Sequence, residues 1–290
     1  MKFSALDLAP EIQQALDACG YSQMTPVQEQ AIIPARRGKN VLANAQTGTG
    51  KTAAFALPIL QQMHDRPKPT EPGCPRALIL TPTRELAEQL ADTIKRYAQF
   101  LPLKIIALYG GVNMDGQQKK LKAGVDIVIS TPGRLLEHVV QCNVSLAKAE
   151  FVVLDEADRM LDMGFYPDIK KIIQQMIPAG KRQSMLFSAT LNELVKSMAF
   201  DFMHVPLDII INPENITVDK IDQQIYHVGR HEKVSLILGL FAKHTPENVL
   251  IFTNTKRMAE ELARRLQKNG FGAEYIMGDL PQSKRISIID

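Results

Sequence analysis

The chain has 290 residues, of which 45% are hydrophobic and 22% are charged, and its net charge is only +3. This composition is ordinary for one large or two modest globular domains, and no apolar run is long enough to suggest a membrane partner. The small net charge does not by itself indicate nucleic acid, so any RNA or DNA site must come from local groups. The three cysteines are widely spaced without a C-x-x-C pair, which favours a reduced, cytoplasmic protein.

In the first part of the chain, short apolar runs alternate with amphipathic stretches. Many residues of the runs are β-branched, and most runs are followed by Gly, Pro, Ser or Thr, as is typical of buried parallel strands. The runs cover residues 41–43, 77–80, 105–108, 127–129, 151–154 and 185–187. An apolar face from Leu86 to Tyr97 predicts a helix over 84–100. The alternation predicts an α/β domain whose binding loops follow the carboxyl ends of parallel strands.

Residues 211–220 follow the last motif of the first part and contain an Asn-Pro pair. We therefore place a linker there, between a first domain over 1–210 and a second over 221–290. In the second domain the pattern restarts. It predicts strands over 225–228, 249–252 and 273–276, helices over 232–242 and 256–269, and a last amphipathic segment over 282–289.

A glycine-rich segment follows the first apolar run and reads Ala45-Gln46-Thr47-Gly48-Thr49-Gly50-Lys51-Thr52. Glycines let backbone N–H groups approach phosphate oxygens, lysine reaches the β- and γ-phosphates, and the threonine hydroxyl binds Mg²⁺. Ala45 stands where G-x-x-x-x-G-K-[ST] has its first glycine, and alone the segment could be a chance turn. Because a predicted strand precedes it and a helix follows, we expect a nucleotide phosphate site.

An acidic segment, Asp155-Glu156-Ala157-Asp158, directly follows the apolar run at 151–154. Asp155 would hold Mg²⁺ through water, and Glu156 would orient or deprotonate an attacking water. Such acids in isolation are commonly just a helix N-terminus. The phosphate segment upstream favours the catalytic interpretation. Lys51, Asp155 and Glu156 are therefore the predicted catalytic residues, and Thr52 and Asp155 the predicted metal-binding residues.

Further short segments accompany these two. They are Phe3, Gly20-Tyr21, Thr25-Pro26-Val27-Gln28, Pro82-Thr83-Arg84-Glu85-Leu86, Gly110-Gly111, Thr131-Pro132-Gly133-Arg134 and Ser188-Ala189-Thr190. In this order and combination the chain resembles a DEAD-box RNA helicase of bacterial type over essentially its whole length. The resemblance implies a RecA-like P-loop domain with a parallel sheet flanked by helices, then a partial second RecA-like domain. It also implies the cofactors ATP and Mg²⁺.

By this resemblance, Gln28 hydrogen-bonds the adenine edge, Phe3 stacks on the ring and Tyr21 belongs to the same site. A glutamine amide offers one donor and one acceptor, which suits adenine and explains a preference for ATP over GTP. For Phe3, core packing is an equally open alternative.

The resemblance also assigns a set of RNA contacts to the first domain. They are Pro82, Thr83, Arg84, Gly110, Gly111, Thr131, Pro132, Gly133 and Arg134. Guanidinium groups, hydroxyls and exposed backbone N–H groups would contact phosphates and sugars, which predicts salt-dependent binding with little sequence preference. Arg84 and Arg134 could instead be ordinary surface arginines, but their position after strands in Thr-Pro contexts favours RNA.

Ser188, Ala189 and Thr190 resemble the segment that bonds back to Asp158 and couples the nucleotide state to domain closure. A simple Ser/Thr turn after a strand is the alternative. In the second domain the resemblance suggests further RNA contacts, namely Thr253, Asn254, Gly278, Asp279, Gln282 and Arg285. Met277 stands where the family usually has His.

The family continues beyond the segment that matches 282–285 with a later arginine that reaches the γ-phosphate, whereas this sequence ends at Asp290. We therefore expect the chain to bind ATP, Mg²⁺ and RNA but to turn ATP over poorly, because such an arginine strongly accelerates hydrolysis elsewhere. Two alternatives stay open. One is an ATP-gated RNA clamp or scaffold without productive unwinding. The other is a P-loop ATPase unrelated to nucleic acid, which would require Arg84 and Arg134 to be inert. Protein partners are not predicted.

Overall fold

The computed structural model describes residues 1–46, 48–211, 222, 224–229 and 231–289. Contacts within the chain define two compact units, Met1–Asn215 and Ile216–Asp290. The predicted linker lies outside the described residues except for Ile211. Among the helices described, none is long and apolar enough to cross a bilayer.

The first unit is built on a seven-stranded sheet in the order β3-β4-β2-β5-β6-β1-β7, with every pair parallel. The strands are β1 (Val41–Asn44), β2 (Ala77–Leu80), β3 (Ile105–Leu108), β4 (Ile127–Ser130), β5 (Phe151–Asp155), β6 (Gln183–Ser188) and β7 (Leu207–Ile210). The first six coincide with the six predicted apolar runs. The edge strand β7 was not predicted, because Asp208 interrupts its short apolar pattern.

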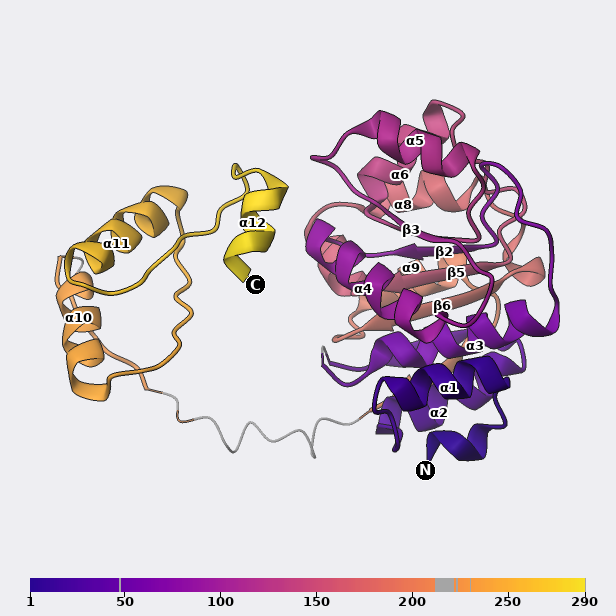
Figure 1. Cartoon of the computed structure of the whole chain (residues 1–290), viewed down its shortest axis with the longest axis horizontal. Coiled ribbons are helices and arrows are strands. Elements are labelled where there is room, and N and C mark those ends of the chain that lie inside the picture. The colour runs from indigo at the N-terminus through magenta and orange to yellow at the C-terminus, as the bar shows by residue number, and fades with distance from the viewer. Residues whose placement is uncertain (47, 212–221, 223, 230, 290) are drawn as a thin grey trace. The chain divides into compact units, whose positions relative to one another are not determined.

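Helices cover both faces of this sheet (Figure 1). They are η1 (Phe3–Leu6), α1 (Pro10–Ala18), α2 (Pro26–Arg36), α3 (Lys51–Asp65), α4 (Arg84–Tyr97), α5 (Met114–Lys122), α6 (Pro132–Val140), α7 (Ala157–Asp162), α8 (Tyr166–Ile173), η2 (Ala179–Lys181) and α9 (Glu193–Phe202). Alternate residues of each strand enter two separate cores. Val153 belongs to the core under α3, whereas Val152 and Leu154 belong to the other. Burial on both faces explains why the strands are continuous apolar runs.

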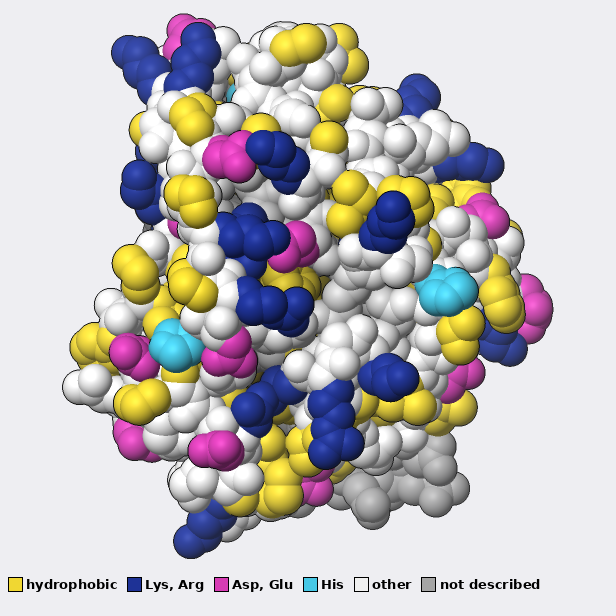
Figure 2. Space-filling view, turned by 90° about the vertical axis from the view of Figure 1, so that its right-hand side faces the viewer, with side chains coloured by type: hydrophobic (Ala, Val, Ile, Leu, Met, Phe, Trp, Pro, Cys, Tyr) yellow, Lys and Arg dark blue, Asp and Glu magenta, His cyan; other side chains and the backbone are white. Residues whose placement is uncertain are grey.

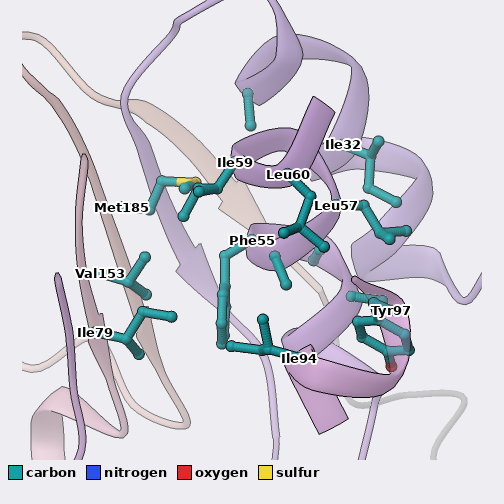
Figure 3. Close-up of a cluster of buried hydrophobic side chains, with 14 of the residues drawn as sticks. Ile32, Phe55, Leu57, Ile59, Leu60, Ile79, Ile94, Tyr97, Val153 and Met185 are labelled. Carbon is teal, nitrogen blue, oxygen red and sulfur yellow. The ribbon is translucent and has the colours of Figure 1, made fainter. Parts of the chain in front are cut away.

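Helix α3 is the centre of one core. Its residues from Ala53 to Met63 are all buried, which is expected of a helix that is apolar on every side. Figure 3 shows Phe55 of α3 pointing towards the strand residues Val153 and Met185, with Ile32 of α2 on the opposite side of the helix. Phe55 also packs against Phe187 of β6, with 5.4 Å between the ring centroids. The helix that begins at the glycine-rich segment is therefore held by packing on two sides.

The second unit contains α10 (Lys233–His244), α11 (Lys256–Lys268) and α12 (Gln282–Ile289), so its two predicted helices are confirmed and the last amphipathic segment is helical. The three predicted strands are wrong, since no described residue of this unit belongs to a strand. The apolar residues of these runs remain exposed, and Leu250 and Phe252 are 79% and 87% accessible. A parallel strand is stable only when neighbours satisfy its backbone and helices cover its faces, and these segments have neither.

The core around α3 gives a direct test of stability. We expect Phe55→Ala to lower the free energy of unfolding by about 3–5 kcal/mol, since it leaves a cavity at a fully buried aromatic residue. Urea unfolding followed by circular dichroism would measure the change. Phe200→Ala is the matched control, because Phe200 is 81% exposed and should change stability by no more than about 0.5 kcal/mol. Equal effects of the two substitutions would contradict this description of the core.

Candidate active site

The predicted functional segments of the first unit follow the carboxyl ends of its strands. Because the strands are parallel, these ends lie along one edge of the sheet. The sheet order divides this edge into two halves. The adjacent strands β1, β6 and β5 precede the glycine-rich segment, the Ser-Ala-Thr segment and the acidic segment. The strands β2, β4 and β3 precede the segments that contain Arg84, Arg134 and Gly110-Gly111. We call these the nucleotide half and the RNA half, after the ligands that the sequence analysis predicts for them.

The glycine-rich loop has the conformation that a phosphate-binding turn requires. Gly48 and Gly50 have φ values of 84° and 88°, which residues with a side chain rarely adopt. A Cβ atom on Gly50 would lie 2.3 Å from Nε2 of Gln28, so only glycine fits. The Ala45 N–H donates to the Ser188 carbonyl (2.9 Å), and the Thr49 hydroxyl donates to the Gln46 carbonyl (2.7 Å). Thr47 lies outside the described residues.

Lys51 begins α3 and is only 6% exposed. Its Nζ lies 3.7 Å from Oδ1 of Asp155, an ion pair without a hydrogen bond, and this ammonium has no hydrogen-bond partner among the described residues. A buried charge without hydrogen bonds is costly. A phosphate group at the N-terminus of α3 would supply the missing acceptors, so the residues present fit a nucleotide.

Asp155 ends β5 with its carboxylate buried beside Lys51. Burial raises its pKa to about 6, with a further contribution from Glu156, while Lys51 opposes the change. Glu156 has a positive φ of 53°, an uncommon conformation for a residue other than glycine and one that is often found at functional sites. Among the described residues no group of three or more His, Cys, Asp or Glu side chains could hold a metal. The buried Asp155 carboxylate at the end of β5 fits Mg²⁺, which typically binds one or two carboxylates together with substrate phosphates and water.

Gln28 connects the start of α2 to the glycine-rich loop. Its Nε2 donates to the Gly50 carbonyl (2.9 Å), and its Oε1 accepts from the Thr25 N–H (2.9 Å). A glutamine amide has two N–H groups and two lone pairs, and these bonds use one of each. The residue is only 2% exposed in this structure. The predicted adenine contact and the phosphate loop are thus bonded to each other directly.

Phe3 is fully buried in the core and meets Tyr21 edge to face, with 5.8 Å between the ring centroids. In this structure Phe3 therefore packs in the core and has no accessible ring face for stacking. Tyr21 is half-buried, and its hydroxyl accepts a hydrogen bond from the Tyr97 hydroxyl (3.0 Å). Tyr21 is thereby held between Phe3 and α4.

Asp158 joins the loops that follow β5 and β6. Its Oδ2 accepts hydrogen bonds from the backbone N–H and the hydroxyl of Thr190 (3.0 and 3.1 Å). Its own N–H donates to the Ser188 hydroxyl (3.3 Å). Ala189 between them is exposed. The acidic segment and the Ser-Ala-Thr segment are therefore bonded to each other, whereas their role in coupling stays a prediction.

In the RNA half, two arginines organise one loop. A Cβ atom on Gly111 would lie 2.3 Å from Nη1 of Arg84, so the Arg84 side chain lies directly on the glycine pair. Arg134 donates from Nε to the Tyr109 carbonyl (3.0 Å), from Nη2 to the Val112 carbonyl (2.6 Å) and from Nη1 to Glu137 (2.8 Å). Its side chain is only 10% exposed, so it is not an ordinary surface arginine. Arg134 fixes the loop with three of its donors rather than presenting all of them to solvent.

Beneath this loop lies a polar network that sequence reasoning missed. Gln117 donates to the Tyr109 carbonyl (3.1 Å), and its Oε1 lies 2.9 Å from Nε2 of His138. The other ring nitrogen of His138 lies 3.3 Å from the Asn143 amide. His138 is fully buried, and burial, with Arg134, lowers its pKa. No motif marks these residues, because their importance comes from contacts between α5, α6 and the loop after α6.

The remaining predicted residues of the first unit lie at the same edge. Thr83 caps α4 by accepting from the Leu86 N–H (3.3 Å), and Thr131 precedes α6, whose first residues are Pro132 and Gly133. A depression of about 470 Å³ lies between the two halves, lined by Thr83, Leu86, Glu156, Asp158, Arg159, Asp162 and Ala189. The acidic segment therefore borders both halves.

In the second unit, the two predicted RNA segments lie together. Lys256 forms an ion pair with Asp279 (2.7 Å), which joins the segment containing Thr253 and Asn254 to Gly278-Asp279. The Thr253 hydroxyl donates to the Thr255 carbonyl (3.1 Å). Further along, Arg285 donates to Oε1 of Gln282 (3.2 Å). The Asp279 carboxylate is therefore engaged by a lysine in this structure.

Comparison with known proteins agrees with this geometry. Residues 25–198 match the DEAD/DEAH box helicase family, and residues 232–290 match the helicase conserved C-terminal domain. The chain belongs to the DEAD/DEAH box helicase family. It is therefore a RecA-like domain followed by part of a second helicase domain, as the sequence predicts.

Individual relatives support the same assignment. The chain is 40% identical to the ATP-dependent RNA helicase RhlB of Pseudomonas aeruginosa, over 100% of this chain and 74% of that protein. It is also 40% identical to RhlB of Xanthomonas oryzae pv. oryzae, over 99% of this chain but only 51% of that protein, so the chain spans about half the length of such relatives. A solved structure of a DEAD box protein from Methanococcus jannaschii superimposes with a TM-score of 0.67, at 35% identity, over 100% of this chain and 76% of that one.

The raised pKa of Asp155 predicts that its charge destabilises the fold. Asp155→Asn removes the charge at nearly constant size, and the raised pKa already includes the attraction of Lys51. We expect the variant to be more stable at about pH 8 by roughly 1–3 kcal/mol, since one pKa unit corresponds to about 1.4 kcal/mol. The cost of the charge is absent below the ordinary pKa of 3.8 and complete above about 6, so the gain should vanish in acid.

Urea unfolding of the Asp155→Asn variant at several pH values would measure this difference. Glu193→Gln is the control, because the side chain of Glu193 is 91% exposed. Removing its charge should change the free energy of unfolding little at any pH. A loss of stability in Asp155→Asn at about pH 8 would show that the pair with Lys51 outweighs the cost of burial.

Proposed function

We propose that this chain is the core of an ATP-dependent RNA helicase, in which ATP binding and hydrolysis in the nucleotide half are coupled to RNA binding in the RNA half and to local duplex unwinding. The observation that carries the proposal is the buried Lys51 ammonium, which lacks hydrogen bonds and lies between a glycine-rich helix N-terminus and the Asp155 carboxylate. The RhlB relatives are described as ATP-dependent RNA helicases, which supports RNA as the second ligand.

In the nucleotide half, each residue has a role that follows from its chemistry. Lys51 and the N–H groups around Gly48 and Gly50 would hold the β- and γ-phosphates. The Thr52 hydroxyl and the Asp155 carboxylate would hold Mg²⁺, which neutralises phosphate charge when bound. Glu156 would orient a water towards the γ-phosphorus and accept its proton as the bond to ADP breaks.

Adenine recognition would rest on Gln28. Its remaining N–H and lone pair match the donor and acceptor of the adenine edge, and its bond to Gly50 would transmit base binding to the phosphate loop. Because Phe3 is buried, we propose no stacking role for it in this arrangement. Tyr21 is the more accessible aromatic residue of this region.

RNA would lie along the loops after β2, β3 and β4 and contact the chain through phosphates and sugars. Arg84 and the glycine pair supply donors near the surface, while Arg134 keeps their loop in position. Thr131, which precedes α6, is buried in this structure. Contacts of this kind carry little sequence information. In the second unit, Thr253, Asn254, Gly278, Asp279, Gln282 and Arg285 are the proposed additional contacts.

The organisation of the chain follows from the same proposal. We assign the ATP-binding helicase domain to residues 1–210, the linker to 211–220 and the start of the second helicase domain to 221–290, which agrees closely with the two compact units. The cysteines Cys19, Cys74 and Cys142 are free thiols, which supports a reducing, cytoplasmic location.

Lys51→Ala tests the nucleotide site. Removing the ammonium should weaken binding of a fluorescent ATP analogue by about 100-fold, because hydrogen bonds to charged groups contribute roughly 1.5–3 kcal/mol. Lys196→Ala is the control, since Lys196 is an exposed lysine on α9 and should leave affinity unchanged. Unchanged affinity in Lys51→Ala would refute the site.

RNA binding and turnover together separate the competing functions. We expect single-stranded RNA to bind more tightly with a non-hydrolysable ATP analogue, and the logarithm of the affinity to fall with the logarithm of salt concentration by about 0.7 per phosphate contacted. Fluorescence anisotropy at two salt concentrations would measure both. Binding without ATP turnover or strand separation would favour the clamp or scaffold, and the absence of RNA binding would favour an unrelated P-loop ATPase.

A further inference from the structure

The edge of the first-unit sheet at which the strands begin is rich in exposed cations. Every strand of a parallel sheet begins at the same edge, opposite the edge that carries the nucleotide and RNA halves. Exposed cations in the loops and helix ends that lead into the strands include Arg37, Lys39, Arg66, Lys68, Lys104, Lys122, Lys148 and Lys181. We call this set the basic edge. Figure 2 looks onto this side of the first unit, and dark blue side chains follow one another down the middle of the face.

Apart from Asp65 and Asp208, which are exposed at the end of α3 and near the start of β7, the acidic groups on this edge are already engaged. Glu150 pairs with Arg76 (2.7 Å) and Lys68 (3.0 Å), and Glu71 pairs with Lys148. Asp126 is buried and accepts hydrogen bonds from the Thr70 hydroxyl and the Lys104 N–H (2.8 Å each). Six cations have no ion-pair partner among the described residues, namely Arg37, Lys39, Arg66, Lys104, Lys122 and Lys181. The edge therefore carries an excess of positive charge that the protein does not neutralise itself.

Helix dipoles explain only part of this excess. Lys122 lies in the last turn of α5, where a cation compensates the negative end of the helix. Lys39 and Lys104 lie beyond the ends of α2 and α4, in the loops that enter β1 and β3. The effect of a helix dipole falls off within its last turn, so these positions require another explanation.

The cations follow the order of the strands. Neighbouring strands are about 4.8 Å apart. In the order β1-β6-β5-β2-β4-β3, the entries to β1, β6, β4 and β3 carry lysines without an ion-pair partner among the described residues, namely Lys39, Lys181, Lys122 and Lys104. Lys148 and Lys68, which precede β5 and β2, are paired with acids. Unpaired positive charge therefore lies on both sides of the two central strands, which matches a partner that carries negative charges along its length.

We propose that the basic edge is a second contact surface for the sugar-phosphate backbone of RNA, on the side of the domain opposite the nucleotide site. The proposal rests on the proposed function only in taking RNA as the partner. An acidic protein fits less well, because protein interfaces have an apolar or aromatic centre and the basic edge is a row of charges. The exposed ring of Phe100, four residues before Lys104, gives one place where a base can stack.

Such a surface makes affinity depend on RNA length. A strand of about 10 nucleotides, the scale of a single-strand site on one domain, can occupy the RNA half alone. A strand several times longer can reach the basic edge as well. Each additional phosphate contact makes the affinity fall more steeply as the salt concentration rises.

The test compares two variants of the whole chain. In the first, Lys39, Lys104, Lys122 and Lys181 are all changed to Gln. In the control, the equally exposed Lys196, Lys233, Lys243 and Lys268 are changed to Gln, so that both variants lose the same charge. Neither set includes a residue of the proposed nucleotide or RNA sites, and thermal unfolding would confirm that both variants fold.

Fluorescence anisotropy would give the affinities for the short and the long RNA and their salt dependence. We expect the basic-edge variant to bind long RNA about 10-fold more weakly, and its salt slope to fall by about 3, because four contacts contribute about 0.7 each. Its affinity for short RNA in the presence of an ATP analogue should not change. The control variant should retain the wild-type affinity for long RNA.

Three results would overturn the proposal. They are wild-type affinity of the basic-edge variant for long RNA, an equal loss in the control variant, and competition by polyglutamate as effective as competition by RNA. The last result would identify the edge as a site for acidic protein. Failure of the proposed function is a separate outcome, in which short RNA does not bind with the ATP analogue while long RNA still binds through the basic edge.

Discussion

The parallel register of the seven-stranded sheet is the constraint on which the rest of the structure depends. It brings loops separated by up to about 140 residues to one edge, where Lys51 meets Asp155 and Asp158 meets Thr190. The strand order then decides which loops are neighbours. Since β5 is the boundary between the two halves, the acidic segment at its end is the one element that borders both. A coupling between nucleotide and RNA would have the shortest path through this strand.

Hydrogen bonds between loops make the nucleotide half a single assembly. Gln28 bonds to Gly50, Ala45 bonds to Ser188, and Asp158 bonds to Thr190. Each bond joins segments that come from different strands or helices, so a shift in one loop must be accommodated by the others. The RNA half is built in the same way, with Arg134 and Gln117 both donating to the Tyr109 carbonyl. A polar contact thus positions each loop that carries a motif.

The sequence predicted the parts of the fold whose cause is local. Six strands are visible because both faces of the sheet are buried, which makes the runs continuously apolar. The motifs are visible because phosphate binding demands particular residues at fixed spacing. The edge strand β7 was missed because one of its four residues is charged, and the strands of the second unit were predicted where no neighbour pairs with them. For Phe3 the sequence left stacking and core packing equally open, and for His138 it gave no signal, since only tertiary packing determines that each is fully buried.

The nucleotide half is arranged for binding rather than for stability. A buried lysine lacks hydrogen bonds, the neighbouring carboxylate has a raised pKa, and Glu156 has a strained positive φ. Each feature costs free energy in the protein alone, and the packing of α3 against the sheet and α2 must offset that cost. A phosphate at Lys51 would supply the missing hydrogen-bond acceptors, so ligand binding would offset the free-energy cost of burying this ammonium. Helix α3, whose side chains are buried from Ala53 to Met63, therefore begins at Lys51, the buried ammonium that lacks hydrogen-bond acceptors. The packing of this helix in the core holds Lys51 in place.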